Sequence, residues 1–413
     1  MKMKHVIIGS GAAGIAAAKT IRNIRPKDEI VLVSSDEVIY SRCMLHKYSG
    51  NERSMESLSF IPDNFFSKNN IIWHKGEYVT GVDTKNNCVM IKDKMISYDK
   101  LLIATGSDAF IPNVGELRNA KNVYSFNHLI DAKIVREKAL SFFGDEKIVV
   151  MGAGLVGLDV AYALLKLRKV VTVVERASQI LPLNLDSTAA SVYQKLFEQN
   201  GCAFKLNSKI SNALSNEKGE ITHMVLENGE TLACNIIIVA TGVRPSIKFL
   251  EDSGIICEQG VVVDQYLQTS KENVYAAGSV TAIGGIWPSA VRQGETAAKN
   301  MCNIKTVLTD TFSAKNTISF FDVPTASIGR LNPENGNTVL IREGVDCYKK
   351  IILQNNIAIG VILQADIAYS GIWQYLIKNS VDLSKIKKSL WDLSFADFYS
   401  IDPETGKYQY NTL

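Results

Sequence analysis

The stretch Lys4–Val33, KHVIIGSGAAGIAAAKTIRNIRPKDEIVLV, determines how this chain folds. An apolar run precedes a glycine turn with the spacing G-x-G-x-x-G (Gly9, Gly11 and Gly14), and an alanine-rich segment and a second apolar run follow. In such a strand–turn–helix, the first two glycines let the backbone turn tightly and approach a pyrophosphate. The third lets helix and strand pack closely, and the helix N-terminus offers N–H groups to phosphates. The stretch therefore predicts a dinucleotide-binding unit.

The contact to the adenosine ribose has three candidates. A dinucleotide site needs an acid near the end of the second strand, where it accepts hydrogen bonds from ribose hydroxyls. Serine occupies the expected place and Asp36 follows slightly late. The contact is therefore Ser35, Asp36 or Glu37.

A second unit with the same pattern begins near Lys147. An apolar run leads into a turn containing Gly152, Gly154 and Gly157, and after a helical segment a further apolar run ends at Glu175. A carboxylate there accepts from a free 2′-hydroxyl and repels a 2′-phosphate, which favours NADH over NADPH. Arg176 weakens this preference because an arginine can bind the phosphate.

Both units end in the same way, which indicates an internal duplication. After alternating, antiparallel-type runs (78–82 and 88–91; 221–232), each unit reaches an apolar strand followed by Ala-Thr-Gly. These residues are Ala104, Thr105 and Gly106 in the first unit and Ala240, Thr241 and Gly242 in the second. A repeated order of this kind is more specific than one glycine motif, so we expect two bound dinucleotides.

Composition limits the remaining possibilities. The 413 residues, 46% hydrophobic and 21% charged, predict two or three globular domains. A net charge of +3 gives no support for a nucleic-acid partner, and no apolar run approaches the roughly 18 residues of a membrane span. The seven scattered cysteines contain no CxxC, which argues against a metal site or a disulfide scaffold and favours the cytoplasm.

From about Thr309 the pattern changes. Alternating runs predict strands over 317–321, 348–353 and 357–363, and two helices are expected over Ile372–Lys378 and Leu383–Leu390. A third domain of α+β type is predicted. Its basic cluster, Lys385, Lys387 and Lys388, is either a solvated helix face or a docking patch for an acidic protein.

With two glycine units, two Ala-Thr-Gly ends and the segment Tyr275-Ala276-Ala277-Gly278 in this order, the chain resembles the FAD-dependent pyridine nucleotide-disulfide oxidoreductase superfamily. The resemblance implies an α/β fold of glutathione reductase-like type, with two Rossmann-like domains and a C-terminal α+β interface domain. Residues 1–113 and 243–308 would bind FAD, the inserted residues 114–242 would bind NAD(H), and residues 309–413 would form the interface.

Within that superfamily, one branch is the more similar. Tyr40, Arg42, Leu45 and Lys47 match the Tyr-x-Arg-x-x-Leu-x-Lys of rubredoxin and ferredoxin reductase-like proteins. Gly360-Val-Ile-Leu also resembles that branch and the flavin domain of assimilatory nitrite reductases. The implied cofactor-binding residues are Gly9, Gly11, Gly14, Ser35, Asp36, Arg42, Val79, Ala104, Thr105, Gly106, Gly278 and Ser279 for FAD, and Gly152, Gly154, Gly157, Glu175 and Gly242 for NAD(H).

Three residues depart from the family pattern. Ser279 stands where an acid commonly accepts from the ribityl chain, and Asp159 stands where glutamate is usual. Cys43 stands where the reductase-like branch has proline, whereas the coenzyme A-disulfide reductase and NADH peroxidase branch has its redox-active cysteine there.

The expected redox residues are Lys47, Asp159 and Cys43. We expect Lys47 to pair with Asp159 beside the isoalloxazine, and the helix beginning near Ser289 to direct its N-terminal dipole at the flavin. A cationic neighbour, Lys47 or His46, would favour the Cys43 thiolate; otherwise Cys43 is inert. His46 is expected to be a loop residue.

The resemblance implies an FAD enzyme that takes hydride from NADH and passes electrons to an iron–sulfur acceptor of ferredoxin or rubredoxin type. It would act as a homodimer or within a hetero-oligomer, the latter including a role as the NADH-linked subunit of a larger complex. One alternative is a Cys43-dependent coenzyme A-disulfide reductase, NADH oxidase or peroxidase. Another is a non-catalytic flavin-binding subunit.

Overall fold

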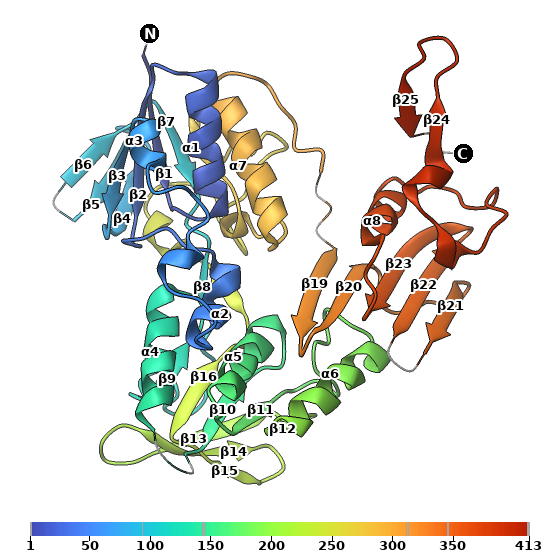
Figure 1. The fold of residues 1–413 in the computed structure, drawn as a ribbon. Helices are drawn as coiled ribbons and strands as arrows, with labels where there is room; N and C mark the ends of the chain where they lie inside the picture. The colour runs from blue at the N-terminus through green and yellow to red at the C-terminus, as the bar shows by residue number, and fades with distance from the viewer. Residues whose placement is uncertain are drawn as a thin grey trace.

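A computed structural model describes residues 2–410 apart from 93, 143, 145, 311, 313, 345 and 346, and it shows three large sheets (Figure 1). The first sheet is parallel, in the order β18-β7-β1-β2-β3. Its strands are β1 (Lys4–Ile8), β2 (Glu29–Ser34), β3 (Ile71–Lys75), β7 (Lys100–Ile103) and β18 (Val274–Ala276). The helices α1 (Ala12–Ile24) and α7 (Trp287–Met301) lie side by side on one face of this sheet. A small antiparallel sheet is formed by β4 (Val79–Asp83), β5 (Cys88–Ile91) and β6 (Lys94–Ser97).

The second sheet repeats this arrangement in the order β12-β11-β10-β16-β9, again parallel. Its strands are β9 (Val123–Ser125), β10 (Ile148–Met151), β11 (Val171–Val174), β12 (Cys202–Lys205) and β16 (Ile236–Val239). The associated helices are α4 (Leu129–Ser141), α5 (Leu155–Lys166) and α6 (Ser187–Gln199), and the antiparallel strands are β13 (Ile210–Ser215), β14 (Ile221–Leu226) and β15 (Thr231–Ala233). The predicted duplication and α/β class are confirmed.

The third sheet is antiparallel, in the order β19-β20-β23-β22-β21. Its strands are β19 (Lys315–Phe320), β20 (Val323–Gly329), β21 (Thr338–Glu343), β22 (Tyr348–Gln354) and β23 (Ile357–Gln364), and α8 (Ser370–Lys378) packs on it. In Figure 1 the hairpin of β24 (Tyr399–Ile401) and β25 (Tyr408–Tyr410) projects away from the rest of the molecule.

The predicted helix over Leu383–Leu390 is wrong. This segment is a loop that leads into the single 3₁₀ turn η5 (Leu390–Asp392). Asp382 accepts from the Ser384 amide at 2.8 Å, and the Ser389 hydroxyl accepts from the Trp391 amide. Short polar side chains that bond the backbone locally in this way compete with helix formation.

A core of buried side chains joins the second sheet to segments far away in the sequence. Leu45 of the short helix α2 (Leu45–Ser49) is buried in it, and so is Phe320 of β19. The Phe320 ring meets Tyr162 of α5 and Phe197 of α6 edge-on, with centroids 5.5 and 5.2 Å apart. This aromatic packing fixes the third sheet against the helices of the second unit.

A buried polar contact strengthens that junction. Asp186 caps α6 by accepting from the Ala189 amide, and its other oxygen accepts from Tyr348 at 2.6 Å and from Lys350 at 2.9 Å. The Asp186 and Lys350 side chains are 7% and 8% exposed. The carboxylate is therefore desolvated, and it needs the partners that β22 supplies.

Lys350→Ala should lower the free energy of unfolding by about 3–5 kcal/mol, because it leaves a buried carboxylate without its cation. The neighbouring Lys349→Ala is the matched control. Lys349 pairs with Asp366, whose side chain is 56% exposed, so the loss there should stay below about 1 kcal/mol. Urea unfolding measures both, and equal losses would contradict this role for Lys350.

Candidate functional site

The first glycine turn has the geometry that the sequence predicts. Gly9 has φ +110°, and a Cβ there would lie 2.2 Å from the Ala104 carbonyl oxygen. A Cβ on Gly14 would lie 2.0 Å from the Gly9 oxygen, whereas one on Gly11 would meet nothing within 4 Å. Gly9 and Gly14 thus permit close backbone packing, whereas Gly11 leaves open space where a phosphate can approach.

The second turn repeats this geometry. A Cβ on Gly152 (φ +101°) would lie 2.6 Å from the Ala240 oxygen, and one on Gly157 would lie 1.9 Å from the Gly152 oxygen. Gly154 again faces open space. The two units also match at their Ala-Thr-Gly segments, because Ala104 packs against Gly9 as Ala240 packs against Gly152.

Each open glycine is the N-cap of a helix. Gly11 precedes α1 and Gly154 precedes α5, and neither glycine has a side chain that could satisfy the free N–H groups. Unsatisfied amides at a helix N-terminus attract anions through hydrogen bonds and the helix dipole. The two turns therefore fit two pyrophosphate groups.

The acidic candidates lie beside these turns. Glu175 bridges the second turn: its Oε2 accepts from the Ala153 amide at 2.7 Å and its Oε1 from the Ala177 amide at 2.8 Å. Beside the first turn, Ser35 is exposed, and Asp36 accepts from the Tyr40 hydroxyl at 2.9 Å. Glu175 is thus held directly at the turn where a ribose would lie.

Arg42 connects the region around Asp36 in the first unit to the segment that precedes α4 in the second unit. Its guanidinium lies 3.6 Å from Asp36, and it donates to the Asn127 carbonyl at 3.5 Å. The Tyr40 hydroxyl accepts from the Leu129 amide at the start of α4. The residues that we predict near FAD therefore also hold α4 in place.

The two Ala-Thr-Gly segments brace each other, which the sequence did not show. The crossover strands that follow them, β8 (Ser107–Ala109) and β17 (Val243–Pro245), pair antiparallel. Thr105 Oγ1 donates to the Ser246 carbonyl at 3.0 Å, and Thr241 Oγ1 donates to the Phe110 carbonyl at 2.8 Å. The repeated threonine is the signal that could have revealed this bracing.

Gln293 is a second residue that the sequence did not reveal. Its fully buried side chain accepts from the Gly278 amide at 2.8 Å and donates to the Ile283 carbonyl at 2.5 Å. It thereby fixes the loop that carries Ser279, which is half-buried at the start of η4 (Ser279–Thr281). A Cβ on Gly294 would lie 2.2 Å from the Ala13 oxygen, so α7 lies directly against α1.

The expected ion pair between Lys47 and Asp159 is replaced by another. Lys47 Nζ lies 3.0 Å from Glu52 Oε2, because the chain turns back after α2. His46 lies on α2 rather than in a loop, and its Nδ1 is 3.6 Å from Asp159 Oδ2. The ion-pair prediction is therefore wrong, although the three side chains do gather at the junction of α2 and α5.

Burial sets the charge of these groups. It raises the pKa of Asp159 to about 8, opposed by the positive charge of Lys47, although 29% of the side chain stays exposed. Burial and Lys47 together lower the pKa of His46 to about 4. At pH 7 the His46 imidazole is neutral and most of the Asp159 carboxyl is protonated. The contact between His46 and Asp159 is therefore not an ion pair.

Cys43 is an exposed residue of the 3₁₀ turn η1 (Arg42–Met44), next to the junction of α2 and α5. Desolvation by the surrounding protein raises the pKa of the Cys43 thiol, and so does the negative charge of Asp159 when that carboxyl is ionised. The two cations that would have favoured a thiolate do not act on it, since His46 is neutral and Lys47 is paired with Glu52. Cys43 is accessible, but its thiolate is disfavoured.

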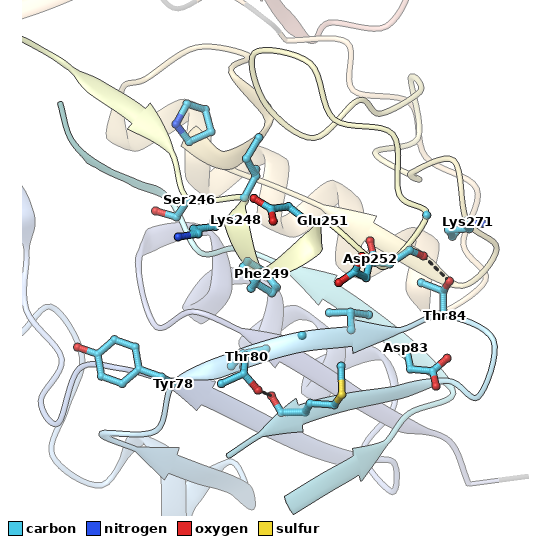
Figure 2. Close-up of a pocket in the computed structure, with 18 of the residues that line it drawn as sticks. Tyr78, Thr80, Asp83, Thr84, Ser246, Lys248, Phe249, Glu251, Asp252 and Lys271 are labelled. Atoms are coloured by element: carbon cyan, nitrogen blue, oxygen red, sulfur yellow. Dashed lines mark hydrogen bonds between the residues drawn. The ribbon is translucent and has the colours of Figure 1, made fainter. Parts of the chain in front are cut away.

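A groove of about 1280 Å³ lies between β4 and residues 245–254 (Figure 2). Its rim carries charges of both signs, including Lys248, Lys271, Glu251 and Asp252. Val79, a predicted FAD contact, lines it on β4, whereas the two glycine turns are not among its lining residues in the described chain. We assign the groove no role.

The basic cluster of the third domain is only partly available. Lys388 forms an ion pair with Asp397 at 2.6 Å, whereas Lys385 and Lys387 are exposed on the loop.

No helix within the described residues has the length and apolar character needed to cross a membrane.

Comparison with known proteins agrees with this geometry. Residues 3–294 match the family described as pyridine nucleotide-disulphide oxidoreductase, which is more than half of the chain. The chain belongs to this family, whose members bind FAD and NADH.

Three curated relatives illustrate the range of the family. The chain is 28% identical to the assimilatory nitrate reductase electron transfer subunit of Bacillus subtilis, over 98% of this chain but only 52% of that protein. It is 33% identical to an NADH oxidase of Methanocaldococcus jannaschii (73% and 71% covered). It is 29% identical to a rubredoxin-NAD(+) reductase of Pseudomonas putida (74% and 81% covered). The chain thus spans about half the length of the Bacillus relative.

Substitutions in the first turn should separate binding from folding. Gly11→Val fills open space, so it should abolish FAD binding while the unfolding midpoint of the FAD-free protein stays unchanged. Gly14→Val forces a side chain into the Gly9 carbonyl and should cost about 1–3 kcal/mol or more of stability. Flavin absorbance per chain and urea unfolding measure the two effects. A Gly11→Val protein that retains FAD would contradict this assignment.

Cys43 should react slowly with iodoacetamide at pH 7, and the rate should rise only as the pH approaches a thiol pKa above its ordinary value. Above about pH 8, where the Asp159 carboxyl is ionised, Asp159→Asn should speed the reaction, because it removes the negative charge that opposes the thiolate. Peptide mass spectrometry measures the alkylation of Cys43. Alkylation at pH 7 faster than that of free cysteine would overturn the electrostatic account.

Proposed function

We propose that this chain is an FAD-dependent oxidoreductase that takes a hydride from NADH and passes electrons to an iron–sulfur protein of ferredoxin or rubredoxin type. The observation that carries the proposal is the duplicated turn: Gly11 and Gly154 each leave open space at an uncapped helix N-terminus. Two such turns, joined by paired crossover strands, suit two dinucleotides bound to one chain.

The division of labour follows the resemblance. FAD supplies the hydride-accepting and electron-releasing chemistry when it is bound. Residues 1–113 and 243–308 hold it, with Gly11 at the pyrophosphate and Gly278 and Ser279 in the loop fixed by Gln293. Residues 114–242 bind NADH, with Glu175 accepting from the ribose, and residues 309–413 form an interface. Lys47 supplies positive charge at α2.

The acceptor is inferred from the relatives. One relative is a rubredoxin-NAD(+) reductase and another an electron transfer subunit. We propose that this chain delivers electrons to an iron–sulfur acceptor of ferredoxin or rubredoxin type, such as a free iron–sulfur protein or a partner subunit. Its free cysteines suit the reducing cytoplasm, and it would act as a homodimer or within a hetero-oligomer.

A second candidate is a Cys43-dependent oxidase, peroxidase or disulfide reductase. The relative named NADH oxidase and the exposure of Cys43 at the α2–α5 junction favour it. The raised pKa of the Cys43 thiol opposes it, because the thiolate is the reactive form.

Anaerobic titration with NADH distinguishes these functions. We expect the wild-type and Cys43→Ser proteins each to take up one electron pair per FAD, as measured by the bleaching of the flavin absorbance. Each should then reduce an added ferredoxin or rubredoxin. Two pairs in the wild type and one in the variant would favour the Cys43-dependent reaction. Bleaching without transfer to any acceptor would favour a non-catalytic subunit.

A further inference from the structure

A second cavity, of about 470 Å³, lies in the third domain, where the sheet, α8 and the turn η5 supply its lining residues. In Figure 1 this domain lies to one side of the two units that carry the glycine turns. Within the described chain, no residue of those two units lines the cavity. Its volume is in the range of small-ligand sites, so it is a candidate binding site separate from both glycine turns.

The sheet places two cations next to each other in this cavity. Arg342 of β21 lies directly opposite Lys349 of β22, and Lys349 lies directly opposite Leu363 of β23. Directly opposite residues of antiparallel strands share one face of the sheet, and all three of these residues line the cavity. Two like charges in such positions destabilise the sheet unless anions compensate them.

Lys349 already has its anion, whereas Arg342 does not. Lys349 Nζ lies 2.6 Å from Asp366 Oδ2, and the other oxygen of that carboxylate accepts from the Ala368 amide at 3.0 Å. The exposed Arg342 guanidinium makes no hydrogen bond or ion pair with any described residue. A guanidinium presents a planar fork of donors that fits a carboxylate, so the cavity has a free position for one.

Two indole rings also line the cavity. Trp373 of α8 is 4% exposed and packs in the core of this domain, and Trp391 of η5 is half-buried against the same core. The Trp373 indole N–H donates no hydrogen bond to a described residue, although a buried tryptophan usually finds an acceptor. The cavity thus combines aromatic surface with a second donor that lacks an acceptor.

We propose that this cavity binds a small planar aromatic molecule that carries one carboxylate. The carboxylate accepts from the Arg342 guanidinium and from the Trp373 N–H, and the aromatic ring packs on Trp391. Asp392 also lines the cavity, and its negative charge disfavours a ligand with two negative charges, such as a phosphate monoester. This site takes no part in the proposed redox reaction, so each proposal is tested independently of the other.

Isothermal titration calorimetry of the FAD-loaded protein tests the proposal, with indole-3-acetate as the probe and the neutral indole-3-acetamide as its matched control. The acid should bind saturably, with a Kd of about 1 mM or below. The amide should bind at least about tenfold more weakly, because hydrogen bonds to a charged group are the stronger ones. Equal binding of acid and amide, or no saturable heat with the acid, would overturn the proposal.

Substitutions locate the bound probe. Arg342→Gln should weaken the binding of indole-3-acetate at least about tenfold. Arg330→Gln is the matched control and should leave binding unchanged, since Arg330 belongs to the same domain, lies outside the cavity and pairs with Glu334. Asp392→Asn should tighten binding up to about fivefold, because it removes a negative charge beside the site.

Two results from these variants refute the proposal. Binding that survives Arg342→Gln shows that the probe lies elsewhere on the chain, for instance at a glycine turn. Weaker binding after Asp392→Asn shows that this carboxylate holds the probe instead of repelling it.

Discussion

Close contacts between backbone segments that only glycine permits are the constraint on which the rest of the structure depends. Gly14 lies against Gly9 and Gly157 against Gly152, at distances where a Cβ would sit about 2 Å from a carbonyl oxygen. These contacts press α1 and α5 onto their sheets and point each helix N-terminus at open space beside Gly11 or Gly154. Phosphate binding follows from this, because the amides there need an anion or water.

The two units are then tied together at two places. The crossover strands β8 and β17 pair, and Thr105 and Thr241 each hold the opposite crossover. The short helix α2 follows the first unit in sequence, yet it buries Leu45 in the core of the second. This placement brings Cys43, His46 and Lys47 to the helix that starts at the second glycine turn. The predicted redox residues Cys43, Lys47 and Asp159 thus lie where the two units with glycine turns meet.

The sequence predicts local geometry well and long-range pairing poorly, for a physical reason. The glycine turns follow from steric rules that act within a few residues, so their conformations could be predicted. The Lys47–Asp159 pair depends on how the chain turns after α2, where Asn51 in a left-handed conformation returns Glu52 to the lysine. Gln293 bonds a loop ten and more residues away in sequence, and nothing in its local pattern marks it. In the segment 383–390, local side-chain hydrogen bonds overrode an apolar spacing that had suggested a helix.

The most direct test of the central claim, that each glycine turn holds one dinucleotide and that both serve one redox centre, is an experimental structure with FAD and NAD⁺ bound together. The account predicts the FAD pyrophosphate at the amides following Gly11 and the NAD⁺ pyrophosphate at those following Gly154. It also predicts that the flavin and nicotinamide rings meet beside Lys47, between α2 and α5. A single bound dinucleotide, or two whose rings point away from this junction, would contradict it.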